Sequence, residues 1–181
     1  MKKAATAVLL YPQFSEYELS AALSILMQGG KPVVTAGVER GAVRGEAGLN
    51  CIPDAVIDEL YHEEIDSLVL PGCMDIMKAA GDERLTHFLK EIESRMNVIA
   101  AISSSPLLLA QADLLKGKKY TVGLNEQARD KSGVFEKENY SDELVIQDGK
   151  IITARGRGFI KFGTAIGKAL GLSFDEGWYK G

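Results

Sequence analysis

The chain has 181 residues, 46% of them hydrophobic and 25% charged, with a formal net charge of −4. This length predicts a single domain over residues 1–181. The mild acidity argues against nucleic acid or an anionic membrane as a partner. The longest uncharged stretch, 96–112, contains Asn, Ser, Pro and Gln and would span a membrane poorly. Two cysteines are too few for a disulfide framework, so we expect a cytoplasmic protein.

Strand and helix patterns alternate along the chain. The predicted strands are 4–10, 32–36, 67–71, 98–102 and 119–122, with hairpins at 39–51 and at 144–152, where Asp148-Gly149 supplies the turn. The predicted helices are 15–28, with Leu19, Leu23, Leu26 and Met27 on one face, 83–96, with Leu85, Phe88, Leu89 and Ile92 inward, 104–115 and 158–170. Residues 55–64 are ambiguous, and the tail from 173 has no assignment.

This alternation predicts an α/β fold, a three-layer, flavodoxin-like sandwich with a mostly parallel sheet and helices on both faces. In such sheets, sites form beyond the carboxyl ends of the strands. Three strand ends are therefore of interest, after Leu10, Leu70 and Ile102.

The stretch 99–112 is the most informative. An apolar run ends in three serines and a proline, and then helical content resumes. This pattern predicts a buried strand, a sharp turn and a helix, with Ser103 raised at the turn as in a nucleophile elbow. The alternative is a structural serine that hydrogen-bonds Glu18 or the amides of the turn.

Three elements converge if the topology is correct: Glu18 at the start of the first helix, the turn 71–74, and the elbow 103–105. Acyl transfer needs a nucleophile, a proton acceptor and backbone donors for an oxyanion. Ser103 and Glu18 would be the first two. The backbone at Gly72, Cys73 and Ser104 would supply the third.

Four segments carry a family resemblance: Phe14-Ser-Glu-Tyr-Glu18, Leu68-Val-Leu-Pro-Gly72, Ala100-Ala-Ile-Ser-Ser-Ser-Pro106 and Asp148-Gly-Lys-Ile-Ile-Thr-Ala-Arg-Gly-Arg-Gly158. In this order they resemble the ThiJ/PfpI superfamily, which includes DJ-1 and the PfpI intracellular proteases, on a class I glutamine-amidotransferase-like fold. The resemblance implies a homodimer, a small-molecule ligand or substrate, and Arg155 in an ion pair near the pocket.

The departures from the family pattern are at two positions. Ser103 stands where the family elbow has its cysteine, and Gly123 stands where many members have a histidine. Glu18 matches the family acid. A serine hydroxyl does not ionise as a thiol does, and Glu18 is a weak base for it. We therefore expect a small-molecule-binding or stress-related module. The alternative is a hydrolase, amidase or lyase that uses Ser103 with Glu18.

The remaining candidates are weaker. Cys73 is either a relocated thiol at the pocket mouth or a small buried hydrophobe. His62-Glu63-Glu64-Ile65-Asp66 imitates a zinc helix motif without its second histidine, and His87 is interpreted as a surface residue. We expect no metal and no cofactor. The expected partners are an unidentified small molecule and a second copy of the chain.

Overall fold

The computed structural model describes residues 4–60 and 65–180. Its strands are β1 (Ala5–Leu10), β2 (Val33–Gly37), β3 (Val43–Arg44), β4 (Asn50–Cys51), β5 (Ala55–Val56), β6 (Ile65–Leu70), β7 (Val98–Ile102), β8 (Val145–Asp148) and β9 (Ile151–Ala154). Seven of them form one sheet in the order β5-β2-β1-β6-β7-β9-β8, and β3 pairs with β4 separately. All neighbours in the large sheet are parallel except β8 and β9, which form the predicted Asp-Gly hairpin.

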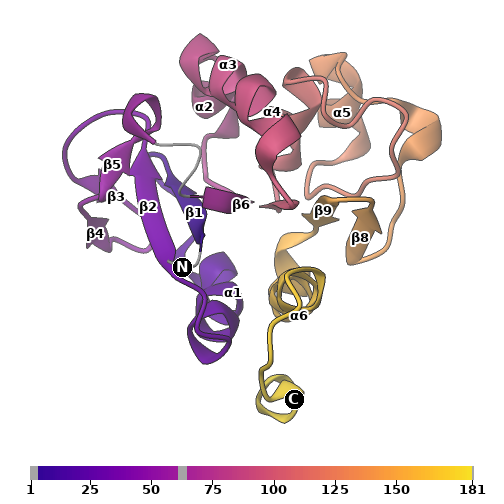
Figure 1. Cartoon of the computed structure of the whole chain (residues 1–181). Coiled ribbons are helices and arrows are strands. Elements are labelled where there is room, and N and C mark those ends of the chain that lie inside the picture. Colours follow the sequence, from indigo (N-terminus) through magenta and orange to yellow (C-terminus); the bar gives the residue numbers. More distant parts are fainter. Residues whose placement is uncertain (1–3, 61–64, 181) are drawn as a thin grey trace.

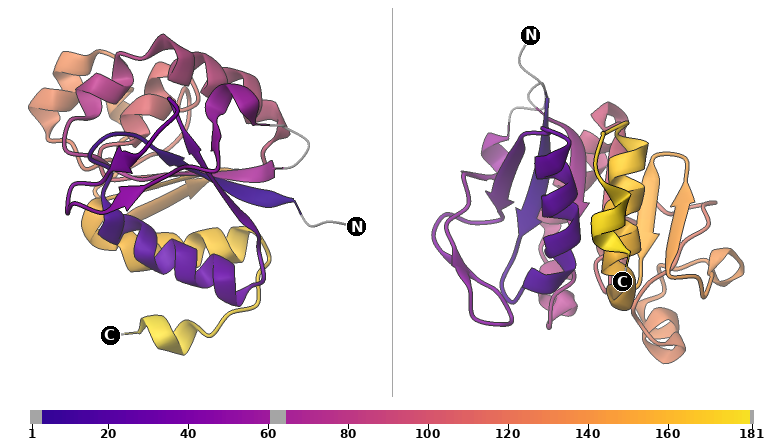
Figure 2. Two further views of the ribbon diagram at one scale, coloured as in Figure 1. Left: turned by 90° about the vertical axis from the view of Figure 1, so that its left-hand side faces the viewer. Right: turned by 90° about the horizontal axis from the view of Figure 1, so that it is seen from below.

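The helices are α1 (Glu16–Gln28), α2 (Ile76–Ala80), α3 (Glu83–Ile92), α4 (Pro106–Gln111), α5 (Glu126–Ser132) and α6 (Phe159–Ala169). Figure 1 shows α1 and α6 below the sheet and α2, α3 and α4 above it. The right-hand view of Figure 2 shows α1 and α6 side by side. The predicted α/β sandwich with a mostly parallel sheet is confirmed.

The core follows from continuous apolar runs in the central strands. Every residue of β7 is buried, and so are Leu68, Val69 and Leu70 of β6. Strands covered on both faces have this composition. On the lower face, α6 approaches α1 closely because Gly163 and Gly167 carry no side chain. A Cβ at Gly163 would lie 2.8 Å from the backbone nitrogen of Ala22.

Three local predictions are wrong. The predicted apolar face of the first helix included Leu23 and Met27, but these are 37% and 66% exposed. The packing against α6 turns the Ala21, Ala22 and Ile25 face inward instead.

The other two errors concern residues 104–115 and 119–122. Helix α4 covers only 106–111, because Ser104 and Ser105 form the turn and the Ser105 hydroxyl lies 2.8 Å and 2.7 Å from the carbonyl oxygens of Leu70 and Ile102. Residues 119–122 make only an isolated bridge between Tyr120 and Tyr140. Tyr120 is also stacked on Phe135, with ring centroids 5.1 Å apart, and the Thr121 N–H donates to the Thr153 hydroxyl.

Helices α2 and α5 were not predicted. Both are short, and each begins at a side-chain cap, Asp75 for α2 and Asn125 for α5. In the parts of the chain that the structure describes, no helix has the length and apolar character needed to cross a membrane.

Candidate functional site at the strand β7 elbow

Ser103 follows β7 directly and has φ of 63°, in the left-handed region that residues with a Cβ rarely adopt. Two backbone hydrogen bonds hold it there. Its N–H donates to the Ala154 carbonyl at 2.8 Å, and its carbonyl accepts from the Gly123 N–H at 2.6 Å. A strained residue fixed from both sides is a feature that clusters at functional sites.

Glu18 lies in the first turn of α1 and is 2% exposed. Its Oε2 accepts the Gly72 N–H at 2.8 Å, its Oε1 accepts the Tyr17 hydroxyl at 3.3 Å, and the carboxyl also hydrogen-bonds the Ser103 hydroxyl. Burial raises the pKa of Glu18, and these hydrogen bonds partly oppose the rise. The structure therefore brings Ser103 and Glu18 together, as the sequence predicts. Their catalytic roles stay predictions. We call Ser103, Glu18, Tyr17 and Gly72 the elbow site.

Two glycines make this close approach possible. A Cβ on Gly72 would lie 2.6 Å from both Glu18 Oε2 and the Cβ of Ser103. A Cβ on Gly156 would lie 2.6 Å from Glu18 Oε1 and 3.3 Å from Ser103 Oγ. Gly72 was predicted at the site from the Leu-Pro-Gly turn. Tyr17 was missed. Gly156 lies in the turn after Arg155, which the resemblance placed near the pocket.

The backbone donors predicted for an oxyanion have different partners. The Gly72 N–H is used by Glu18, and the Cys73 N–H points to the Ser104 hydroxyl at 3.3 Å. The Ser104 N–H has no acceptor among residues 4–60 and 65–180. The expected cluster of donors at Gly72, Cys73 and Ser104 thus has one N–H unoccupied in the described part of the chain.

Cys73 is a half-buried free thiol in the turn after β6. Burial, together with the negative charges of Asp75, Glu18 and Glu46, raises the pKa of the Cys73 thiol to about 12. Because the thiolate is the nucleophilic form, this environment favours an inert thiol. This supports an unreactive Cys73, although the residue is half-buried and not fully buried.

Arg155 follows β9 and forms the predicted ion pair, but it points away from the elbow site. Its Nη1 lies 3.4 Å from Oδ1 of Asp142, whose side chain is 86% exposed. An ion pair this exposed contributes little to stability.

Of the two histidines, only His87 lies in the described part of the chain. His87 lies on α3 with its Nε2 3.1 Å from Glu91 Oε1, whereas His62 and its neighbours Glu63 and Glu64 are outside the described residues. No group of three potential metal ligands occurs within the described ranges.

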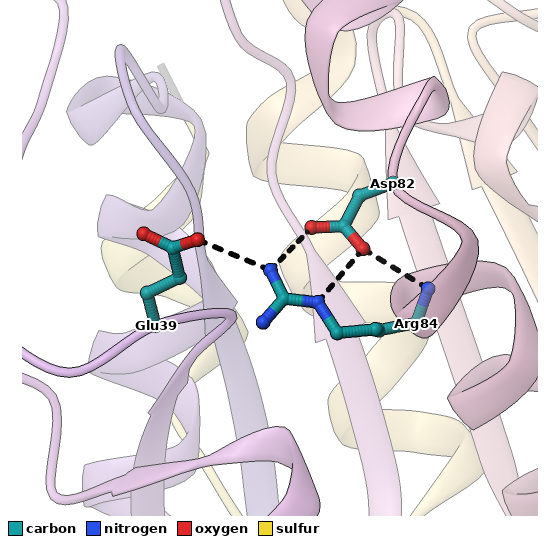
Figure 3. Close-up of polar contacts among 3 residues, drawn as sticks. All are labelled: Glu39, Asp82 and Arg84. Carbon is teal, nitrogen blue, oxygen red and sulfur yellow. Dashed lines mark hydrogen bonds and ion pairs between the residues drawn. The ribbon is translucent and has the colours of Figure 1, made fainter.

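A groove of about 820 Å³ lies between the 38–46 segment and residues 74–82, and none of the four elbow-site residues is part of its lining. Tyr11 and Gln13 also line it. Figure 3 shows how an arginine connects its two walls: Nη2 of Arg84 lies 2.8 Å from Asp82 Oδ2 and 3.2 Å from Glu39 Oε1. These exposed ion pairs link the start of α3 to the loop after β2.

Comparison with known proteins agrees with this geometry. The chain is 32% identical to the protein dj-1beta of Drosophila melanogaster over 156 residues, covering 83% of this chain and 80% of that protein. It is 28% identical to the deglycase PfpI of Pyrococcus furiosus, covering 81% and 86% of the two chains. A DJ-1 superfamily protein of Agrobacterium tumefaciens shares the fold, with a TM-score of 0.86 at 24% identity over 97% of this chain and 94% of that one.

The match to the family model is equally broad. The model for the DJ-1/PfpI family matches residues 4–169, which include β1, the turn after β6, the Ser103 elbow and α6. The chain therefore belongs to the DJ-1/PfpI family.

Proposed function

We propose that the chain binds a small molecule non-covalently at the elbow site and performs no thiol chemistry there. The observation that supports this most is Ser103, which keeps a left-handed conformation against the buried Glu18 carboxyl while carrying a hydroxyl. A serine that served only as a turn residue would not need such strain, since glycine adopts this conformation freely.

The chemistry of Ser103 argues against a cysteine-like reaction. A hydroxyl needs an adjacent base to become a nucleophile, and the base in contact with it is a carboxyl. Position 123 supplies no imidazole. A Cβ at Gly123 would lie 3.0 Å from the carbonyl carbon of Ser103, so a side chain there would press on the elbow backbone.

One specific observation favours the alternative function, a hydrolase, amidase or lyase. The Ser103 hydroxyl is hydrogen-bonded to Glu18, whose raised pKa makes the carboxylate a better base than an exposed one. The unoccupied Ser104 N–H would face an oxyanion formed at Ser103.

Two rate measurements separate these functions. Purified protein is assayed for consumption of methylglyoxal, with the Pyrococcus furiosus deglycase PfpI as a positive control, and for hydrolysis of p-nitrophenyl acetate. Each assay is repeated with Ser103→Ala and with Cys73→Ser. The proposal expects no rate that Ser103→Ala lowers. A rate abolished by Ser103→Ala would establish the serine enzyme, and one abolished only by Cys73→Ser would show that the reactive thiol has moved.

A cytoplasmic homodimer, expected from the sequence, completes the proposal. Support for self-association comes from apolar side chains on α1 and in and beside the β3–β4 hairpin, where Tyr17, Leu49 and Ile52 are 50%, 58% and 81% exposed. Sedimentation velocity should give a mass twice the 19.6 kDa of the chain. A single species at the monomer mass at micromolar concentration would refute the dimer.

A further inference from the structure

We propose that the elbow site, taken as the ligand site argued above, admits neutral and positively charged ligands in preference to anions, and that the Glu46 carboxylate sets this preference. The ligand class is thus an uncharged or amine-bearing small molecule. Carboxylates and phosphates are disfavoured.

The backbone and one hydroxyl fix Glu46 beside the elbow site. Its N–H donates to the Phe14 carbonyl at 2.9 Å, and its Oε1 accepts the Ser15 hydroxyl at 2.6 Å. Ser15 is 2% exposed and donates its own N–H to the Gly72 carbonyl at 2.8 Å. Since the Gly72 N–H binds Glu18, a short chain of contacts leads from Glu46 to the carboxyl that holds Ser103.

The Glu46 charge is not neutralised by a neighbour. Within the described residues, no Lys, Arg or His forms an ion pair with it. Its field reaches the site, because it contributes to the raised pKa values of Tyr17, Glu18 and Cys73. Burial is the first cause of all three shifts, and the charges that act on Tyr17 besides burial are those of Glu18 and Glu46.

Two arginines of this region lie against other residues. Arg155 is paired with Asp142. The Nη2 of Arg44 lies near Gly48 of its own hairpin, 3.2 Å from where a Cβ would stand. Asp75, which also lines the groove, adds a second negative charge near Cys73. Arg40 and Lys78 line the same groove, with Arg40 in an ion pair with Glu59. An anion entering beside Ser103 would still meet the Glu46 carboxylate, whereas an ammonium group would be attracted to it.

The charge preference can be read without knowing the ligand. A thiol is introduced by Ser103→Cys in a Cys51→Ser, Cys73→Ala background. It is then modified with trimethylammonium-ethyl methanethiosulfonate and, separately, with sulfonatoethyl methanethiosulfonate. The same thiolate attacks the sulfenyl sulfur of either reagent and displaces methanesulfinate, so the ratio of the two rates cancels the acidity of the thiol. Dividing by the ratio for β-mercaptoethanol removes the intrinsic difference between the reagents.

We expect the corrected ratio of the cationic to the anionic modification rate to be about 10 at low salt and to fall as salt is added. Glu46→Gln keeps an acceptor for Ser15 and should lower the ratio about threefold or more. Glu83→Gln, which removes the same charge from the exposed start of α3, should leave it unchanged. A ratio at or below unity, or equal effects of the two substitutions, would overturn the proposal.

The native thiol of Cys73 provides a second place to measure the ratio. If the Ser103→Cys protein does not fold, the same ratio is measured at the native Cys73 in a Cys51→Ser chain, because Glu46 acts there too. That measurement is made at alkaline pH, where more of the Cys73 thiol is ionised, and a ratio at or below unity there also overturns the proposal. Ester hydrolysis that depends on Ser103 would refute the proposed function and leave this ratio intact.

Discussion

Two neighbouring strands each end in a residue with a possible nucleophile, Cys73 after β6 and Ser103 after β7. The thiol is intrinsically the stronger nucleophile, yet it lies half-buried among carboxylates that help raise its pKa to about 12. The hydroxyl is the weaker one, yet it has the strained backbone, the buried acid and an open N–H close by. The backbone strain and the buried acid thus lie at Ser103, whereas the intrinsically more reactive side chain is that of Cys73.

The largest expected effect is a loss of stability when a side chain is added at Gly72, which packs against Ser103 and Glu18. In Gly72→Ala the new Cβ would lie 2.6 Å from Ser103 Cβ and from a Glu18 oxygen that is already hydrogen-bonded. We expect the free energy of unfolding to fall by about 3 kcal/mol, because neither neighbour can move freely. Urea denaturation measures the change.

The matched control is Gly81→Ala, at the end of α2. There a Cβ would be 3.6 Å from the nearest atoms and φ is −79°, so we expect a neutral or slightly stabilising change. If Gly72→Ala were as harmless as Gly81→Ala, the close packing of Ser103 and Glu18 would not exist in solution.

A smaller effect tests the strain at Ser103. Ser103→Ala and Ser103→Gly both remove the hydroxyl, but only glycine relieves the left-handed φ of 63°. The glycine variant should unfold with a free energy about 1 kcal/mol higher than the alanine variant. At Ser94, which is exposed in an ordinary 3-10 turn, the order should reverse. The same order at both positions would mean that Ser103 is not strained.

The smallest expected effect is the pH dependence from Glu18, because burial and hydrogen bonding act in opposite directions on its pKa. A carboxyl with a raised pKa in the folded state stabilises the fold fully below its ordinary range of about 4 to 4.5, and this contribution is lost as pH rises through the raised value. Wild type should therefore lose stability relative to Glu18→Gln as pH rises above the ordinary carboxyl range of about 4 to 4.5.

Glu16 gives a control of opposite sign. Its slight desolvation is outweighed by backbone N–H groups, including those of Ala47 and Leu49, which lower its pKa. Wild type should gain stability relative to Glu16→Gln as pH rises over the acid range. Parallel pH profiles for the two variants would contradict the difference in burial between these carboxyls.

The sheet could be predicted from the sequence because each central strand is a short apolar run that ends in a turn signal. Leu70-Pro71-Gly72 and Ile102-Ser103 place two turns at one edge, and the parallel topology then brings them together. The Glu18 contact could be predicted only through the order of the family segments, since no local pattern indicates that an acid in the first turn of a helix is buried.

The wrong predictions of secondary structure and burial arise where contacts between distant segments determine the local structure. The apolar residues at 119–122 predicted a strand, but ring packing of Tyr120 on Phe135 replaced ladder pairing. Leu23 and Met27 were exposed because the glycines of α6 select a different face of α1. The environment of Cys73 and the position of Glu46 depend on contacts between segments far apart in sequence.

The central claim is that the position of Ser103, and not the thiol of Cys73, defines the site. Its most direct test is the rate of iodoacetamide alkylation against pH for two single-thiol proteins: one with Cys73 alone, and one with Ser103→Cys alone. Cys73 should titrate near its pKa of about 12. The thiol at position 103 should titrate below the ordinary thiol pKa of about 8.5, because the Ser104 N–H at the start of the following turn, which has no acceptor among the described residues, favours its thiolate. A Cys73 that reacts faster at neutral pH, or equal titrations, would contradict the account.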